Sequence, residues 1–386
     1  MTKKIYTVRF KQDFIEAWTR SKATFLEHCE RFGVSRQSGY EWLELVRVRG
    51  LEGLEPKSSA PHSCPHATSD EVVELVVAAR KLHPTWGPRK LGPWIKPQKP
   101  DVELPAPSTM GEILKRAGLV PPRKRRSRTP RYSEPFVDVE APNDVWTADF
   151  KGQFHTRDGK LCYPLTLVDC YSRFVLRCDG YRSPGAEARA SFESAFIEYG
   201  LPRAIRTDNG TPFVVSRAPA GLSSLSVWWV RLGITPERIT PASPWENGRH
   251  ERMHRTLKAE TTKPPQVNLR VQQRVFDNFR SEFNDERPHE ALGQKRPATA
   301  YNKSSRVYPK KLPELVYPDD YELRRVSTSG NMKWHGRQVF VSEALRYEVV
   351  GLKQTTDVTW DVYFGPIRLG TLSSERRDLG LIRVRD

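Results

Sequence analysis

Residues 145–150 read Val-Trp-Thr-Ala-Asp-Phe, a short run in which polar side chains alternate with apolar ones. This pattern is typical of a β-strand that packs one face against a core and turns the other toward a cleft. Because a strand holds its side chains in fixed directions, Asp149, near the end of the run, is expected to present its carboxylate rigidly. The stretch therefore predicts a strand and a candidate acidic site.

A second acid follows a second predicted strand. Residues 204–206, Ala-Ile-Arg, form that strand, and Asp208 ends it where an Asn-Gly pair turns the chain sharply. Residues 161–169 and 173–176 predict further strands, and residues 186–199 predict a helix. Strands, a crossover helix and another strand predict a mixed sheet with helices.

A third acid lies on a predicted helix. Asn247 is placed to cap a helix that begins near Gly248, so that Glu251 lies one turn inside it. Arg255 and Lys258 follow Glu251 by four and seven residues and share its face. Two cations therefore lie beside the carboxylate, where a phosphate backbone would pass, and both are predicted to contact DNA.

The three acids together indicate a specific chemistry. Considered singly, each is more often a turn cap or a surface ion pair. Three carboxylates that converge can hold two divalent metal ions about 3.5–4 Å apart, the arrangement used for in-line attack at a phosphodiester. We therefore predict that Asp149, Asp208 and Glu251 are both the catalytic and the metal-binding residues.

Length and charge narrow the class of protein. The chain has 386 residues, whereas single cores stop growing at about 250–300, so we expect about two to four domains. The formal net charge of +17 gives a positive field that favours nucleic acid or another polyanion. A ribosome-associated or merely basic protein would share this charge.

Cysteine use and hydropathy indicate the compartment. Five cysteines, an odd number without a Cys-x-x-Cys pair, argue against a disulfide framework and a four-ligand zinc site. The first residues lack the apolar stretch of a signal peptide, and no run approaches about 18 apolar residues. We expect an intracellular, cytoplasmic protein without membrane contact.

The first predicted domain, residues 1–55, is a helix-turn-helix. Gly33 is placed for a left-handed C-cap of one helix, and Ser35 for the N-cap of the next. Arg36 and Gln37 would begin the recognition helix, whose apolar face starts at Tyr40. A plain helical hairpin is the alternative. The residues predicted to contact DNA here are Ser35, Arg36, Gln37 and Tyr40.

Residues 56–122 predict a second helical, winged-helix-like DNA-binding unit, with helices at about 70–81 and 110–117 and an N-cap at Ser108. A basic linker, residues 123–140, follows it. Such a run neutralises phosphates or is simply a solvated linker. Its predicted DNA contacts are Arg123, Lys124, Arg125, Arg126 and Arg128.

Residues 306–386 are predicted to form a small all-β domain, a barrel or a sandwich. The apolar runs that indicate its strands lie at 333–334, 338–341, 348–352 and 358–364. With the basic linker, this domain would hold a nucleic-acid backbone largely without regard to sequence.

Several motifs give a family resemblance. Residues 141–305 resemble the integrase core shared by bacterial insertion-sequence transposases and retroviral integrases. The motifs that carry the resemblance are Trp-Thr-Ala-Asp-Phe at 146–150, Val-Asp-Cys-Tyr-Ser-Arg-Phe at 168–174, Thr-Asp-Asn-Gly at 207–210, Pro-x-x-Asn-Gly-Arg-His-Glu-Arg at 244–252 and Asn-Asp-Glu-Arg-Pro-His-Glu-Ala-Leu-Gly at 284–293. Residues 83–90 and 114–120 also resemble those transposases.

The resemblance implies an α/β RNase H-like fold for the core. It also implies a DDE active site with two Mg²⁺ or Mn²⁺ ions, and transfer of a DNA 3′-hydroxyl to a target phosphodiester. The expected partners are double-stranded DNA, both element ends and target, and further copies of the chain assembled on that DNA. The expected location is the bacterial cytoplasm, in association with the nucleoid.

One departure from the family concerns spacing. Asp208 and Glu251 are separated by 42 residues, more than is common in the family, whereas Glu246 would leave 37. We choose Glu251 because the motif places the acid after Asn-Gly and inside the helix. A stretch rich in Ser, Ala and Gly, residues 216–226, is expected to absorb the extra length. Asp169 is a spare acid beside Asp149 and the weaker candidate for a ligand.

The same helix contains a competing motif. His250 and His254 flank Glu251 in the pattern His-Glu-x-x-His, which grips zinc in metalloproteases. A basic helix with no third ligand in a known spacing argues against a protease. Two alternatives keep the integrase core: a catalytically silent DNA-binding regulator, and a metal-dependent endonuclease without strand transfer.

Overall fold

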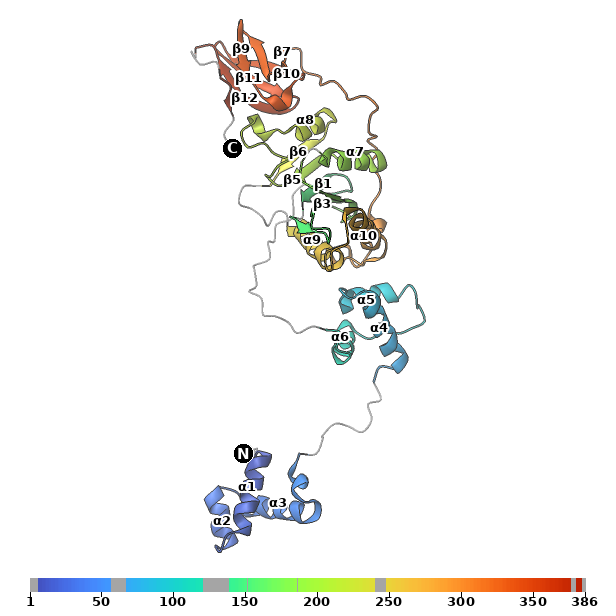
Figure 1. Cartoon of the computed structure of the whole chain (residues 1–386), viewed down its shortest axis with the longest axis vertical. Helices are drawn as coiled ribbons and strands as arrows, with labels where there is room; N and C mark the ends of the chain where they lie inside the picture. The colour runs from blue at the N-terminus through green and yellow to red at the C-terminus, as the bar shows by residue number, and fades with distance from the viewer. Residues whose placement is uncertain are drawn as a thin grey trace. The chain divides into compact units, whose positions relative to one another are not determined.

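The computed structural model describes residues 6–56, 67–120, 139–150, 152–185, 187–239, 248–375 and 380–383. The chain divides into two compact units, Met1–Thr68 and Ser69–Asp386 (Figure 1). Several residues singled out in the sequence lie outside the described parts: Arg123, Lys124, Arg125, Arg126, Arg128, Glu246 and Asn247.

Three helices build the first unit. They are α1 (Val8–Thr19), α2 (Phe25–Phe32) and α3 (Arg36–Arg49), and the short 3-10 helix η1 (Leu51–Leu54) follows them. Aromatic rings fill the space between the helices, and those of Phe14 and Trp42 meet edge to face with centroids 5.5 Å apart. The predicted all-helical N-terminal domain is confirmed.

The turn between α2 and α3 has the predicted caps. Gly33 has a φ of 60°, a left-handed conformation that glycine adopts without strain. Ser35 Oγ accepts a hydrogen bond from the N–H of Ser38, one of the free donors at the start of α3. The expectation that Tyr40 faces the core is wrong, because α3 buries Trp42 and leaves the Tyr40 side chain 58% exposed.

Three further helices open the second unit: α4 (Asp70–Leu82), α5 (Pro88–Ile95) and α6 (Pro107–Arg116). They share an apolar core around Trp86 and Leu91. The N-cap predicted at Ser108 is wrong, because Pro107 already occupies the first turn and Ala106 caps the helix. The described residues from 67 to 120 contain no strand, so this part of the chain shows helices without a wing.

These helices contact the body that follows them. His83 Nδ1 lies 3.0 Å from Glu282 Oε1, and Lys90 Nζ donates to a backbone carbonyl of the segment after α10 (Leu269–Ser281). The guanidinium of Arg287 lies over the ring of Trp86, 5.7 Å from its centre. Burial, with a contribution from nearby Arg287, lowers the pKa of Lys90 to about 8.

A six-stranded mixed sheet forms the central body. Its strands are β1 (Val145–Phe150), β2 (Phe154–His155), β3 (Leu161–Asp169), β4 (Val175–Tyr181), β5 (Ala204–Thr207) and β6 (Thr235–Arg238). They lie in the order β2-β3-β1-β5-β6, with β4 also paired to β3. The predicted α/β core is confirmed. The strand expected at 173–176 runs further, because β4 continues along β3 to Tyr181.

Helices cover both faces of this sheet: α7 (Ala188–Tyr199) and α8 (Ser224–Arg231) on one, α9 (Gly248–Thr261) and α10 on the other. Trp146 and Ala148 of β1 join the apolar core of the first face. Thr147 and Asp149, which alternate with them, turn toward α9. The two faces of β1 therefore have different chemistry.

The C-terminal part is a β domain. Its strands are β7 (Tyr321–Arg325), β8 (Asn331–Trp334), β9 (Arg337–Phe340), β10 (Val349–Thr356), β11 (Thr359–Phe364), β12 (Ile367–Ser373) and β13 (Ile382–Arg383). Five pair in the order β13-β12-β11-β10-β7, and β8 pairs with β9. The described residues show no pairing that closes a barrel. The β content is confirmed; the expected barrel closure is not seen.

The β domain packs on α8. Val227 and Val230 of α8 belong to the same apolar cluster as Phe364 and other strand residues. Arg231 Nη1 lies 2.6 Å from Glu348 Oε2, and both side chains are mostly buried. The domain therefore shares its core with the central body.

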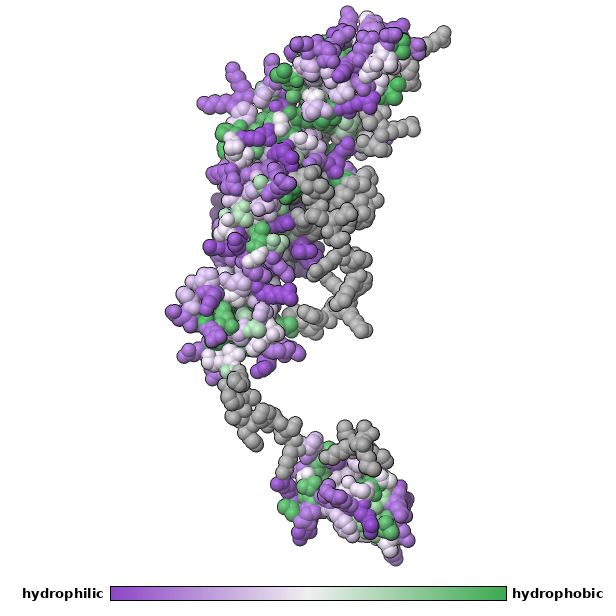
Figure 2. All heavy atoms as spheres, turned by 180° about the vertical axis from the view of Figure 1, so that it is seen from behind, coloured by the Kyte–Doolittle hydropathy of each residue, from purple (hydrophilic) through white to green (hydrophobic). Residues whose placement is uncertain are grey.

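The face of the molecule drawn in Figure 2 is mainly polar. Figure 2 shows a face on which hydrophilic side chains predominate and apolar ones occur in scattered groups. Within the described ranges, no helix combines the length and apolar character needed to cross a membrane.

Close packing between β4 and α10 gives a test of this arrangement. A Cβ atom on Gly180 would lie 2.9 Å from Leu269 Cδ1 and 3.2 Å from Phe276 Cε2. We expect Gly180→Ala to destabilise the protein by about 1–3 kcal/mol, measured as a lower urea midpoint of tryptophan fluorescence. Gly185→Ala is the control, since nothing lies within 4 Å of its Cβ position. Equal midpoints for both variants would contradict the close packing.

Candidate active site

The sheet places two of the predicted acids side by side. Strands β1 and β5 are parallel neighbours, and Ala148 pairs with Thr207 at the end of their shared register. Asp149 and Asp208 each come directly after this pair. Because adjacent strands lie about 4.8 Å apart, the two aspartates occupy the same carboxyl-terminal edge of the sheet.

A tight turn holds Asp208 at that edge. Its Oδ1 accepts a hydrogen bond from the N–H of Gly210 at 3.1 Å. The side-chain amide of Asn209 donates to the carbonyl of Ile239, which follows the neighbouring strand β6. The Asn-Gly pair therefore turns the chain as the sequence predicted, and it anchors the turn to the sheet.

Helix α9 carries the third acid on its exposed side. Glu251, Arg255 and Lys258 are all exposed and, at this spacing, share one face of the helix. The opposite face is apolar at Met253 and Leu257, which join the core beneath α9 and α10. These three side chains therefore lie on the exposed side of α9, and their contact with DNA stays a prediction.

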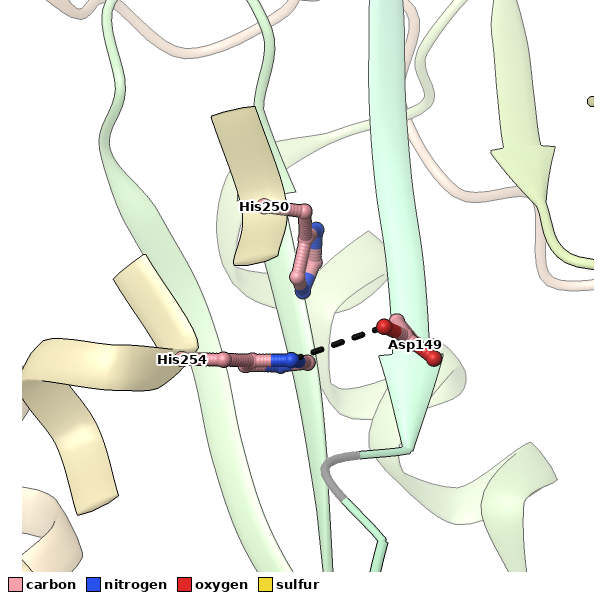
Figure 3. A group of neighbouring side chains, drawn as sticks. All are labelled: Asp149, His250 and His254. Carbon is pink, nitrogen blue, oxygen red and sulfur yellow. Dashed lines mark ion pairs between the residues drawn. The ribbon is translucent and has the colours of Figure 1, made fainter. Parts of the chain in front are cut away.

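Two histidines attach the buried face of α9 to the sheet. His250 Nδ1 lies 2.8 Å from Thr147 Oγ1 on β1. His250 Nε2 and His254 Nε2 each lie 2.6 Å from Thr166 Oγ1 on β3. His254 Nδ1 lies 3.5 Å from Asp149 Oδ2, and Figure 3 shows the two side chains turned toward each other.

Asp149 therefore forms a compact group with His250 and His254, in which potential ligand atoms lie within 4.8 Å of one another. In the described parts of the chain, these three side chains are the group whose ligand atoms lie close enough together to share a metal ion. Asp208 and Glu251 do not belong to that group. The structure thus brings Asp149 and Asp208 to one sheet edge and places Glu251 on the adjoining helix. It does not draw the three carboxylates into one cluster.

From the sequence alone, the two histidines were interpreted only as a zinc-protease motif, and their threonine partners were not identified. A signal for part of this network was present, since histidines four residues apart share a helix face and Thr147 lies two residues before Asp149, on the same face of its strand. What the sequence did not supply was the register that brings them together.

Asp169 has a structural role. Its side chain is fully buried, and its Oδ1 accepts from the backbone N–H of Asn143 at 2.7 Å. Its Oδ2 accepts from both the N–H and the hydroxyl of Ser172. Burial raises the pKa of the Asp169 carboxyl, and these donors oppose the rise. The residue therefore holds the turn after β3.

The predicted DNA-contacting residues of the first unit are accessible. Ser35, Arg36, Gln37 and Tyr40 are exposed at the start of α3. The ring of Tyr40 rests against that of Phe25, with centroids 4.2 Å apart. A face of α3 is therefore free for contact, and what contacts it is considered below.

Three family models match the chain. Residues 139–244 and 232–297 each match an integrase core domain, and residues 38–114 match a homeodomain-like domain. The insertion element IS476 uncharacterized 39.2 kDa protein of Xanthomonas euvesicatoria is 26% identical over 287 residues, covering 73% of this chain and 79% of that protein. The insertion element IS407 uncharacterized 31.7 kDa protein of Burkholderia multivorans is 26% identical over 209 residues, covering 53% and 73% respectively.

Among solved structures, a chain of the simian T-cell lymphotropic virus intasome, in complex with PP2A regulatory subunit B56 gamma, is 17% identical with a TM-score of 0.37. The match covers 74% of this chain and 91% of that one. The HTLV-2 integrase catalytic core domain in complex with magnesium is 18% identical with a TM-score of 0.33, covering 42% and 98%.

The mixed sheet and the family matches define an integrase core preceded by a homeodomain-like region. Residues 139–297 therefore form an integrase core domain, and the chain is similar to proteins of bacterial insertion elements.

The structural role of Asp169 can be tested. An amide in its place turns an N–H₂ group toward at least one donor, so we expect Asp169→Asn to lower the free energy of unfolding by about 1–3 kcal/mol. Urea unfolding would measure this loss. Ser172→Ala, which removes one of the donors, should cost less. An unchanged urea midpoint in Asp169→Asn, with DNA cleavage lost, would instead make this acid part of the active site.

Proposed function

We propose that this chain is a transposase that cuts DNA at the ends of a mobile element and joins the resulting 3′-hydroxyl to a target phosphodiester. The observation that carries the proposal is the register of β1 and β5, which sets Asp149 and Asp208 at one sheet edge beside the helix that bears Glu251. The insertion-element relatives support the same assignment.

The donors at this edge suit a hard divalent cation. Carboxylate oxygens are the ligands that Mg²⁺ and Mn²⁺ prefer. Asp149, Asp208 and Glu251 would hold two such ions. When bound, these ions supply an activated attacking oxygen and charge stabilisation on the leaving oxygen.

The protein's own residues have separate roles in this proposal. Asp149 and Asp208 are fixed by strand ends, so they define where the reacting phosphate must lie. Arg255 and Lys258, which are exposed on the Glu251 face of α9, would hold the DNA backbone beside the acids. No covalent protein–DNA bond is required, because a water or a DNA hydroxyl is the nucleophile.

The remaining parts would bind DNA. Exposed residues at the start of α3 would read bases in the major groove, as the recognition helix of a helix-turn-helix does. The α4–α6 unit, the basic linker and the β domain would contribute contacts that do not depend on sequence. Since the reaction acts on two DNA ends, we propose that copies of the chain assemble on DNA.

Nicking of supercoiled plasmid in Mn²⁺ tests the acids. We expect Asp149→Asn, Asp208→Asn and Glu251→Gln each to lower the nicking rate at least about 100-fold, which corresponds to a loss of about 3 kcal/mol of transition-state stabilisation. Each variant should still bind the plasmid. Asp285→Asn removes an exposed charge elsewhere on the core and should keep the wild-type rate.

The same assay separates Glu251 from Glu246. Loss in Glu246→Gln with retention in Glu251→Gln would overturn our choice of the third acid. A wild-type chain that binds plasmid tightly but leaves it intact, even with added element ends, would favour the silent regulator. Joining of a pre-cut 3′-hydroxyl end to a second duplex separates a transposase from a nuclease.

Base reading by α3 can be tested by selection from a random duplex pool with the full chain. We expect the wild type to enrich a motif, and Arg36→Ala to weaken binding to that motif by about 1–3 kcal/mol, with discrimination lost at one position. Arg31→Ala removes an exposed charge from α2 and is the matched control. Equal loss in both variants would show that the arginines act only through charge.

A further inference from the structure

We propose that Thr147, His250, Thr166 and His254 form a one-directional chain of hydrogen bonds whose last member, His254, faces the Asp149 carboxylate and positions it. This inference rests on the proposed function of Asp149. The two histidines and two threonines are positioning residues, since Asp149 is the one member of this network that would touch the reacting groups.

The chain of hydrogen bonds is continuous and buried. Its hydrogen bonds measure 2.8 Å from Thr147 to His250, 2.6 Å from His250 to Thr166 and 2.6 Å from Thr166 to His254. His254 Nδ1 then lies 3.5 Å from Asp149 Oδ2, a longer contact than these hydrogen bonds. The exposed fractions of the four positioning residues lie between 0% and 8%. Water therefore has little access to replace a lost link.

Counting protons assigns a direction. A neutral imidazole has one N–H donor and one acceptor nitrogen, and a threonine hydroxyl donates one proton. If His254 Nδ1–H points at Asp149, then His254 Nε2 accepts from the hydroxyl of Thr166. Thr166 Oγ1 in turn accepts from His250 Nε2–H, and His250 Nδ1 accepts from the hydroxyl of Thr147. Every proton is used once, and each points toward the carboxylate.

The reverse direction of these hydrogen bonds is less stable. It would give His254 its proton on Nε2 and turn the Nδ1 lone pair toward the Asp149 carboxylate, 3.5 Å away and largely out of water. Two acceptors facing each other in a buried place are destabilising. The protons of Thr166 and Thr147 also go to their nearer acceptors, the histidine nitrogens at 2.6 and 2.8 Å, because the competing carbonyls of Asp149 and Val168 lie 3.3 Å from the two hydroxyl oxygens.

The chain links two elements that carry different catalytic acids. His250 and His254 belong to α9 and flank Glu251, whereas Thr147 belongs to β1 and precedes Asp149 by two residues. Fixing the histidines against the strands therefore fixes the position of Glu251's helix relative to Asp149. Removing one link should loosen the site without touching DNA or metal ligands.

Thr166 offers the sharpest substitution. Thr166→Val keeps the shape of the side chain and removes the hydroxyl, whereas Thr166→Ser keeps the hydroxyl. Residues that orient metal ligands typically contribute about 10–100-fold to activity. We expect Thr166→Val to lower kcat of plasmid nicking by about this factor, with KM for plasmid changed less than about twofold. Thr166→Ser should restore most of the rate.

Thr261→Val is the matched control. This threonine is buried on α9, the helix of His250 and His254. Its hydroxyl donates to the carbonyl of Leu257 and takes no part in the hydrogen bonds described above. It should keep the wild-type rate and a similar unfolding midpoint. A Thr166→Val rate equal to wild type, or an equal loss of rate in Thr261→Val, would overturn the proposal.

A second readout needs no activity. In the full chain labelled with ¹⁵N-histidine, long-range ¹H–¹⁵N spectra at pH 7.5 should show His254 protonated on Nδ1 alone and His250 on Nε2 alone, assigned with His254→Gln and His250→Gln. A His254 ring protonated on Nε2, alone or together with Nδ1, overturns the direction. A different result would contradict the proposed function itself: a wild-type protein that does not nick DNA, with no further change in Asp149→Asn.

Discussion

The central body depends on the two unlike faces of strand β1. Trp146 and Ala148 pack into the large apolar core under α7 and α8, and this fixes which way the strand is turned. A shift of one residue in register would bury Asp149 in that core and expose the tryptophan. Because burial of an unpaired carboxylate is so costly, the apolar face determines the direction of the acidic one. The position of Asp149 is therefore a consequence of core packing.

Local pattern was enough to predict the parts of the fold that local chemistry decides. The limits of β1 and β3, the start of α3 and the caps at Gly33 and Ser35 agree with the sequence, because alternation and capping act over a few residues. Helix α5 has Pro93 inside it and was not predicted, since its stability comes from burial of Leu91 and Ile95. The extent of β4 and the absence of barrel closure depend on long-range pairing, which a local pattern does not contain.

The candidate site was predicted in the same uneven way. Each acid was predicted from its own short motif, and the parallel register of β1 and β5 places Asp149 and Asp208 at neighbouring strand ends. The contact between the α4–α6 helices and the central body was not predicted, although both segments that form it had been noticed as motifs. His83 contacts Glu282, and Trp86 contacts Arg287. Part of the motif at 83–90 and part of the motif at 284–293 therefore serve to pack the α4–α6 helices against the central body. A motif that resembles a family can thus mark a contact and not a catalytic group.

The histidines of α9 show why spacing alone does not identify a metal site. Two histidines four residues apart face one way on a helix, whether the partner ahead of them is a zinc ion or a strand. Here three of the four ring nitrogens meet threonine hydroxyls at 2.6–2.8 Å, and the fourth faces Asp149. Zinc binding would have to break these bonds inside a nearly dry space, and the threonines would lose their partners. The same i, i+4 geometry that suits a protease zinc therefore serves here to join the helix of Glu251 to the strand of Asp149.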